Sequence, residues 1–264
     1  MPIPQSARTE ILHRLAAAEV EHDVKILYAV ESGSRAWGFA SPNSDFDARF
    51  IYVHRREWYL SVGLEEQRDV IEYPIVDEMD INGWDVRKAL RLLWKSNPAI
   101  VEWLHSPIVY QSHTNFAESA RTLLPNVYAT HAGIYHYKNT AKTNFRGYLQ
   151  GDEVRLKKYF YVLRPLLSVR WLVRFCVSAP IEFDKLLDML DDAPLRAVID
   201  DLVALKKQTP ELGLSPKVPE LNAFIEQELM RLDGQNPEVI RHEGVLRHLN
   251  VLFHAALDQA WTCP

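Results

Sequence analysis

The sequence is poor in the residues that build disulfide frameworks and cysteine metal sites. Only two cysteines occur in 264 residues, Cys176 and Cys263, and no CxxC pair is present. Small disulfide-rich domains and cysteine zinc sites need more cysteines at closer spacing, so the sequence fits neither class and suits a reducing cytosol. The N-terminal residues lack the apolar core of a signal peptide, and no apolar run approaches the length of a membrane span. The composition predicts a soluble cytoplasmic protein.

Several catalytic signatures are also absent. The chain contains no GxxxxGK[ST] loop, no GxGxxG loop, no GxSxG elbow and no HExxH pair. These absences argue against a P-loop enzyme, a Rossmann fold, a serine hydrolase of that type and a zinc protease. The net charge of -5 argues against nucleic acid binding over the whole surface, although it leaves room for a local basic groove.

Hydrophobic spacing predicts alternating helices and strands in the first part of the chain. Helical spacing predicts a helix over 6–21, and short runs rich in β-forming residues predict strands over 24–30, 46–54 and within 68–81. A short helical segment is expected at 35–39. Another helix is expected over 85–96 with Asp85 as its N-cap, so this acid is set aside as a ligand.

The rest of the chain has helical spacing almost throughout. Helices are expected over 131–149, 153–175, 184–192, 194–207, 220–232 and 238–257. Pro165 should kink or divide the second of these helices. We therefore expect an α+β part over 1–108 and an all-helical part over 109–264, with the boundary near Ser106-Pro107.

Two aspartates, Asp45 and Asp47, stand one residue apart at the start of a predicted strand. Side chains at positions i and i+2 of a strand point to the same face, about 6–7 Å apart. Two carboxylates so placed repel each other unless a cation lies between them, and Mg²⁺ commonly takes one or two carboxylates plus substrate phosphates. Asp80, an acid between two apolar residues in a later extended run, is the candidate third ligand, and Asp77 and Glu78 compete with it.

A Gly33-Ser34 pair lies between the first predicted strand and the short helical segment. Helix N-termini leave backbone N–H groups unpaired and bind phosphate, and a glycine lets the phosphate approach the backbone. Arg35 adds a full charge and a planar fork of donors. Alone, such a pair is more commonly a simple turn.

Three longer stretches carry a family resemblance. They are similar to the DNA polymerase β-like nucleotidyltransferase superfamily and, within it, to the predicted nucleotidyltransferase family associated with RNA ligases: GSRAWGFASPNSDFDARFIY, GWDVRKALRLLWKSNPAIVEWL and KKYFYVLRPLLSVRWL. The resemblance implies a small mixed sheet with flanking helices, followed by an all-helical domain. It also implies that Asp45 and Asp47 bind two Mg²⁺ ions, for which Mn²⁺ can substitute. Asp80 would hold the ion that activates the attacking hydroxyl, and Gly33 and Ser34 would grip the nucleoside triphosphate.

The helical part is locally basic. Between residues 138 and 174, nine Lys or Arg stand against two acids in a chain that is acidic overall. In the superfamily, a helical second domain commonly closes over the triphosphate with such residues, although each one alone is as readily a solvated cation. The candidates for nucleotide contact, beside Gly33, Ser34 and Arg35, are Lys142, Lys157, Lys158 and Arg164.

The residues and the resemblance together predict an enzyme. It would move a nucleoside monophosphate from an NTP such as ATP to a hydroxyl acceptor and release pyrophosphate. The association with RNA ligases favours an RNA 3′ end as acceptor, in a tRNA or a repair substrate. A small molecule or a protein as acceptor, and a catalytically silent nucleotide-binding regulator, are the alternatives. No membrane partner is expected.

Overall fold

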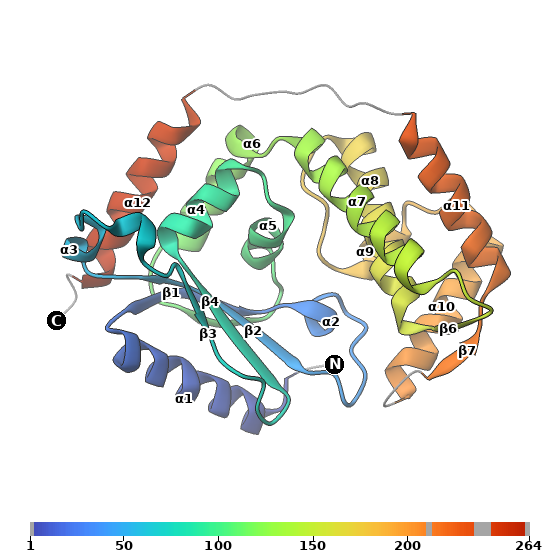
Figure 1. The fold of residues 1–264 in the computed structure, drawn as a ribbon, viewed down its shortest axis with the longest axis horizontal. Coiled ribbons are helices and arrows are strands. Elements are labelled where there is room, and N and C mark those ends of the chain that lie inside the picture. Colours follow the sequence, from blue (N-terminus) through green and yellow to red (C-terminus); the bar gives the residue numbers. More distant parts are fainter. Residues whose placement is uncertain (1–2, 210–212, 235–243, 262–264) are drawn as a thin grey trace. The chain divides into compact units, whose positions relative to one another are not determined.

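The computed structural model describes residues 3–209, 213–234 and 244–261, which form two compact units (Figure 1). The first unit comprises the described parts of Met1–Ala36, Asp45–Tyr128 and His242–Pro264, and the second comprises those of Trp37–Ser44 and Ala129–Arg241. The fold is α+β, with a small mixed sheet and flanking helices in the first unit and a mostly helical second unit. Within the described ranges, every helix is too short or too polar to span a bilayer.

A five-stranded mixed sheet in the order β3-β4-β2-β1-β5 forms the centre of the first unit. β2 and β4 are parallel, and the other neighbouring pairs are antiparallel. The strands expected over 24–30 and 46–54 are confirmed, and the segment 68–81 contributes to two strands. The strand bounds are β1 Lys25–Glu31, β2 Phe46–Val53, β3 Val70–Glu72, β4 Met79–Asp85 and β5 Val109–Ser112.

One face of this sheet packs against helix α1 (Gln5–His22), as Figure 1 shows, close to the expected range 6–21. Alternate residues of β2 and β4 enter that core, which is why the two strands show a buried and half-buried alternation. A methyl group on Gly83 of β4 would lie 2.2 Å from the ring of Phe50, so glycine is needed for this ring to pack across the strand. The residues between the buried ones point to the opposite face, and that face carries the polar groups described below.

The opposite side of the first unit is covered by helices that come from distant parts of the chain. Helix α4 begins after Asp85, whose carboxylate accepts a hydrogen bond from the Arg87 backbone N–H at 2.8 Å, so the predicted N-cap is confirmed. Helix α12 contacts α4 and α6. The beginning of the helix expected over 238–257 lies outside the described residues. The remaining bounds are α2 Gly33–Ala36, α3 Arg56–Tyr59, a 3₁₀ helix Leu64–Glu66, α4 Val86–Trp94, α5 Pro98–Leu104, α6 Phe116–Val127 and α12 Val245–Trp261.

The second unit is helical apart from one short hairpin-like pair of strands. β6 (Glu153–Arg155) and β7 (Leu214–Pro216) are antiparallel, so the expected helix over 153–175 was wrong in its first turn. Pro165 lies inside α8 and does not divide it, because buried side chains on both sides outweigh one lost backbone hydrogen bond. The helices are α7 Thr130–Tyr148, α8 Lys157–Phe175, α9 Phe183–Leu187, α10 Ala193–Gln208 and α11 Pro219–Asp233.

The two compact units differ from the ranges 1–108 and 109–264. β5 pairs with β1, α6 contacts β1 and α12 contacts α4, so three elements beyond residue 108 belong with the sheet. Conversely, the segment Trp37–Ser44 belongs with the helices, since the Trp37 carbonyl accepts a hydrogen bond from the Phe183 N–H at 2.9 Å and Phe39 stacks on Phe160. Local spacing carries no signal for such long-range contacts.

Candidate active site

The parallel pairing of β2 and β4 places Asp47 directly opposite Asp80. Both aspartates alternate with buried apolar residues, so both carboxylates lie on the face away from the α1 core. Their side chains are 27% and 21% exposed, respectively. Two acids that are 33 positions apart in the sequence therefore share one half-buried surface.

A guanidinium group joins these two carboxylates. Arg49 Nη2 donates to Asp80 Oδ2 at 2.6 Å and to Asp47 Oδ1 at 3.2 Å, and Arg49 Nη1 donates to the Asp80 carbonyl at 2.7 Å. The Asn82 amide donates to the other oxygen of Asp80. Arg49 and Asn82 stand two residues after the acids on the same strands, so all four side chains point the same way. The positive charge between the aspartates is thus supplied by the chain itself.

The electrostatics of Asp47 include the third acid. Burial raises the pKa of the Asp47 carboxyl; Arg49 opposes that change, and the charges of Asp80 and Asp45 add to it. Asp45 itself is exposed and immediately precedes β2. Asp80 and Asp45 therefore both lie within electrostatic range of Asp47, and Arg49 joins Asp47 to Asp80.

Gly33 lies against the Asp47 carboxylate. Its φ is +58°, and a Cβ atom built there would lie 2.0 Å from Asp47 Oδ2, so only glycine leaves room for the acid. The neighbouring Ser32 N–H donates to the Asp47 carbonyl at 2.9 Å. Ser34 is half-buried and, among the described residues, makes no side-chain hydrogen bond. The predicted Gly33-Ser34 pair therefore adjoins the acidic cluster, by which we mean Asp45, Asp47 and Asp80.

Arg35 is buried instead of open to a ligand. Its Nε donates to the Asp45 carbonyl at 3.2 Å, and its guanidinium lies 4.0 Å from the centre of the Phe46 ring. Arg35 Nε is also 3.9 Å from a carboxylate oxygen of Glu31. In this structure, Arg35 supports the backbone that carries Asp45.

Glu31 is a residue that the sequence reasoning missed. It is fully buried at the end of β1, where it accepts hydrogen bonds from the Asp47 backbone N–H at 3.1 Å and from the Tyr110 hydroxyl at 2.5 Å. Burial raises the pKa of its carboxyl to about 7, although both hydrogen bonds lower it. The sequence did contain a signal for Glu31, because it is a single acid at the end of an otherwise apolar strand. Glu31 positions Asp47 from behind.

The competing acids lie elsewhere in the first unit. Asp77 and Glu78 occupy the turn between β3 and β4 with φ values of 53° and 61°, and both are exposed. Asp77 accepts a hydrogen bond from Arg14 at 3.0 Å. Asp85 is the N-cap of α4 and accepts a hydrogen bond from the Tyr59 hydroxyl. Asp80 is therefore the acid of this set that shares a face with Asp47.

The four basic candidates Lys142, Lys157, Lys158 and Arg164 all belong to the second unit. The amino group of Lys142 is 3.1 Å from Asp233, that of Lys158 lies 3.8 Å from the centre of the Tyr148 ring, and Arg164 is buried. Lys157 is half-buried. Burial of Lys206 lowers the pKa of that residue, and the nearby charge of Lys157 lowers it further. Lys142 and Arg164 are therefore engaged by protein groups, and Lys157 and Lys158 lie at the start of α8.

The donors of the acidic cluster suit a hard divalent cation. Among the residues that the structure describes, no group of three or more His, Cys, Asp or Glu side chains is arranged to hold a metal ion. Mg²⁺, however, usually takes only one or two protein carboxylates and completes its octahedron with substrate phosphates and water. Asp47 and Asp80 offer two such carboxylates on one surface, which already hold a cationic group between them.

Comparisons with known proteins identify the family. The family model described as RlaP, RNA repair pathway DNA polymerase beta family, matches residues 7–255. An uncharacterized protein, YcgL of Bacillus subtilis (strain 168), is 43% identical over 256 residues, which cover 96% of this chain and 98% of that protein. A nucleotidyltransferase-like protein from Exiguobacterium sibiricum 255-15 matches 94% of this chain and 90% of its own, with 13% identity and a TM-score of 0.34. On the family match, this chain belongs to the RNA repair pathway DNA polymerase β family of nucleotidyltransferases.

Proposed function

We propose that this protein transfers a nucleoside monophosphate from an NTP to the 3′ hydroxyl of an RNA. The observation that carries this proposal is the pairing of Asp47 with Asp80 across two parallel strands, next to Gly33, which has no side chain to displace the Asp47 carboxylate. Carboxylates on one rigid sheet and open backbone at a strand end are what phosphoryl transfer requires, since that chemistry depends mainly on orientation and charge stabilisation. The acceptor oxygen forms a bond to the α-phosphorus, and the bond to the leaving pyrophosphate breaks.

Each residue of the cluster has a role in this proposal. Asp45, Asp47 and Asp80 would hold two Mg²⁺ ions, or Mn²⁺ in their place, and such ions, when bound, neutralise charge on the attacking and leaving oxygens. Gly33 and Ser34 would bind the triphosphate through backbone N–H groups and the serine hydroxyl. Arg49 holds the carboxylates in place before the ions bind.

Residues around the cluster act in the same proposal at longer range. Glu31 and Arg35 position Asp47 and Asp45. Contact with the triphosphate is proposed for Lys157 and Lys158; the other two predicted contacts are less suited to it, since Arg164 is buried and Lys142 pairs with Asp233. Arg35 was predicted as a further contact, but its burial favours the positioning role.

RNA is the proposed acceptor because the description of the family that includes this chain names an RNA repair pathway. The sparse cysteines, of which Cys176 is exposed and unpaired, support the cytoplasm as its location.

The test is to supply Mg²⁺ or Mn²⁺, each α-labelled NTP in turn and total RNA, and then to separate RNA, protein and small molecules. We expect label in the RNA, and we expect Asp47→Asn to lower the rate at least about 100-fold while the protein stays folded. Asp77→Asn is the matched control and should keep the wild-type rate, because Asp77 lies in the exposed turn.

Each other outcome assigns a different function. Label in protein or in small molecules would replace RNA as the acceptor. An NTP that raises Tm without any transfer would indicate the silent regulator. Full activity in Asp47→Asn would refute the catalytic role of the acidic cluster.

A further inference from the structure

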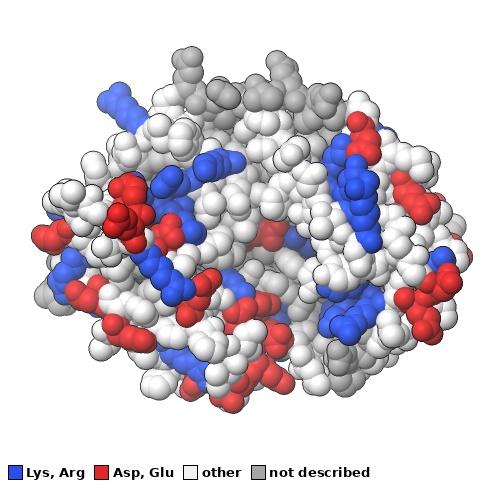
Figure 2. All heavy atoms as spheres, viewed as in Figure 1, with Lys and Arg blue, Asp and Glu red and all other residues white. Residues whose placement is uncertain are grey.

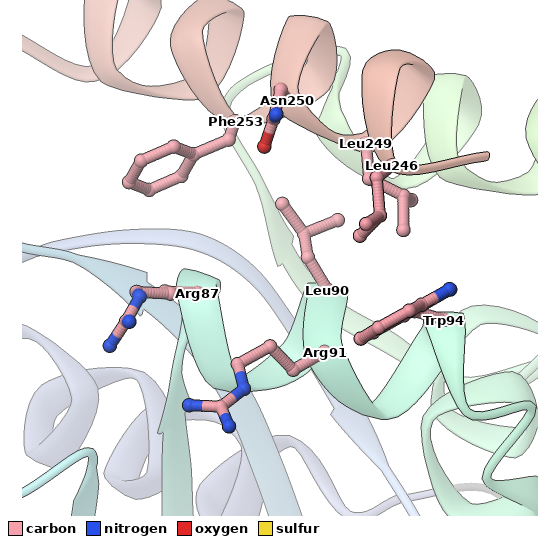
Figure 3. A pocket seen from close by; sticks show the side chains of 8 residues that line it. All are labelled: Arg87, Leu90, Arg91, Trp94, Leu246, Leu249, Asn250 and Phe253. Atoms are coloured by element: carbon pink, nitrogen blue, oxygen red, sulfur yellow. The ribbon is translucent and has the colours of Figure 1, made fainter. Parts of the chain in front are cut away.

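A groove lies between α4 and α12 of the first unit, away from the acidic cluster. It has a volume of about 250 Å³. Figure 3 shows Leu90 and Trp94 of α4 directed toward the leucines of α12, with Arg87 and Arg91 along one edge. The lining contains two arginines and no acid, and consists of Arg87, Leu90, Arg91, Trp94, Leu246, Leu249, Asn250 and Phe253.

The edge of the groove is positively charged. Arg87, Arg91 and Lys95 follow one another at one-turn spacing, and Figure 2 shows Lys and Arg side chains gathered over α4. Arg87 pairs with Glu65 at 2.8 Å. Arg91 and Lys95 are exposed and make no side-chain hydrogen bond or ion pair within the described ranges. Glu65 also lies within electrostatic range of Arg91, so one acid faces three cations, and this surplus of positive charge favours an anionic partner here.

Trp94 supplies an open aromatic face beside these cations. It is 47% exposed. In the described ranges each of the other six tryptophans contacts an aromatic ring or a cation; Trp84, for example, stacks on Trp103 with centroids 3.7 Å apart. Trp94 makes no such contact.

We propose that this groove binds a single-stranded segment of the RNA acceptor, with a base stacked on Trp94 and a phosphate at Arg91. A flat aromatic face beside guanidinium groups is the usual chemistry of single-strand binding. The groove is smaller than the roughly 300–1,000 Å³ of sites that enclose a whole ligand, and it suits one base of a strand that continues on both sides. This inference rests on the proposed transfer to RNA.

The position of the groove sets the length of RNA that can reach it. Asp80 stands near the start of β4 and Asp85 at its end, so the strand separates the acids from the first turn of α4 by about 16 Å. At about 3.4 Å per stacked nucleotide, that distance corresponds to roughly five nucleotides. A stacked acceptor of fewer nucleotides does not span β4, so short acceptors are expected to miss the groove.

The test measures binding of 3- and 12-nucleotide RNAs by fluorescence anisotropy in low salt. We expect Trp94→Ala to weaken binding of the 12-mer about tenfold or more and Trp94→Phe to restore most of it, because stacking needs a ring face. Arg91→Ala should reduce the slope of log K against log salt by about one. The matched control is Arg68→Ala, which removes an exposed arginine paired with Glu72 at the sheet edge.

Transfer assays separate this inference from the proposed function. For the 12-mer, Trp94→Ala should raise KM about tenfold at constant kcat, and for the 3-mer it should change neither. The proposal that the groove binds RNA would be overturned if Trp94→Ala bound the 12-mer as well as wild type does, or if it lost the same affinity for both RNAs. If wild type transfers no label to RNA, the proposed function fails, while the anisotropy of Trp94→Ala still decides whether the groove binds a strand.

Discussion

Replacing Arg49 with glutamine leaves Asp47 and Asp80 facing each other without the guanidinium between them. The change removes charge-assisted hydrogen bonds to both carboxylates, and all three side chains are less than a third exposed. A hydrogen bond to a charged group contributes about 1.5–3 kcal/mol, and the glutamine amide can replace one of them. We therefore expect the free energy of unfolding to fall by about 2–4 kcal/mol in the presence of a chelator.

The assay is thermal unfolding with and without Mg²⁺. At about 2–4 °C per kcal/mol for a chain of this size, Tm should fall by roughly 4–16 °C in chelator. An excess of Mg²⁺ should return most of the loss, because a ligand at 100 times its Kd stabilises the folded state by about 2.7 kcal/mol. Arg68→Gln is the control, since its exposed pair with Glu72 contributes little.

A double-mutant cycle measures the coupling between Arg49 and Asp47. If Arg49 stabilises the fold by separating two negative charges, Arg49→Gln should be less destabilising when Asp47 is already asparagine. Arg49 does not act by separating the two charges if the two changes are additive, or if Mg²⁺ raises the Tm of wild type and Arg49→Gln by the same amount.

Two further predictions concern single residues of the first unit. Gly33→Ala should destabilise the fold by about 1–3 kcal/mol and abolish transfer, because its Cβ would displace the Asp47 carboxylate; Gly38→Ala, with φ +90° and no atom within 4 Å, is the control for backbone strain. Burial raises the pKa of Asp85 to about 6, so the wild type loses stability as pH rises from about 4 to 6. Asp85→Asn keeps the N-cap without the charge, and urea unfolding should show it gaining up to about 3 kcal/mol over wild type between pH 4 and 7; a pH-independent difference would contradict this.

The core of the site could be anticipated from the sequence because strands alternate. An acid between two buried residues has to face away from the core, which is how Asp80 could be distinguished from Asp77 and Glu78. Its role as a metal ligand stays a prediction. Arg49 was missed although the same rule applied to it, since it stands two positions after Asp47. The alternation along the strand could therefore have indicated Arg49 as a cation between the acids, but the prediction named only a metal ion.

Other features depend on contacts that no local pattern records. Strand β5 is only four residues long and pairs with β1, some 80 positions earlier, so its alternation was too short to separate from a helix. The short pair β6 and β7 was missed for the same reason. The placement of α12 beside α4 depends on which apolar faces meet, and spacing within one helix cannot specify its partner.

The discontinuous make-up of the first unit has a consequence for biosynthesis. Its sheet is complete once β5 has left the ribosome, but one wall of the unit, α12, is translated only after the second unit. The apolar side of α4 that contacts α12 therefore stays exposed to solvent while more than a hundred intervening residues leave the ribosome. Shortened versions that stop after β5 or α6 should therefore expose that surface and aggregate, even though they contain every acid of the proposed catalytic cluster.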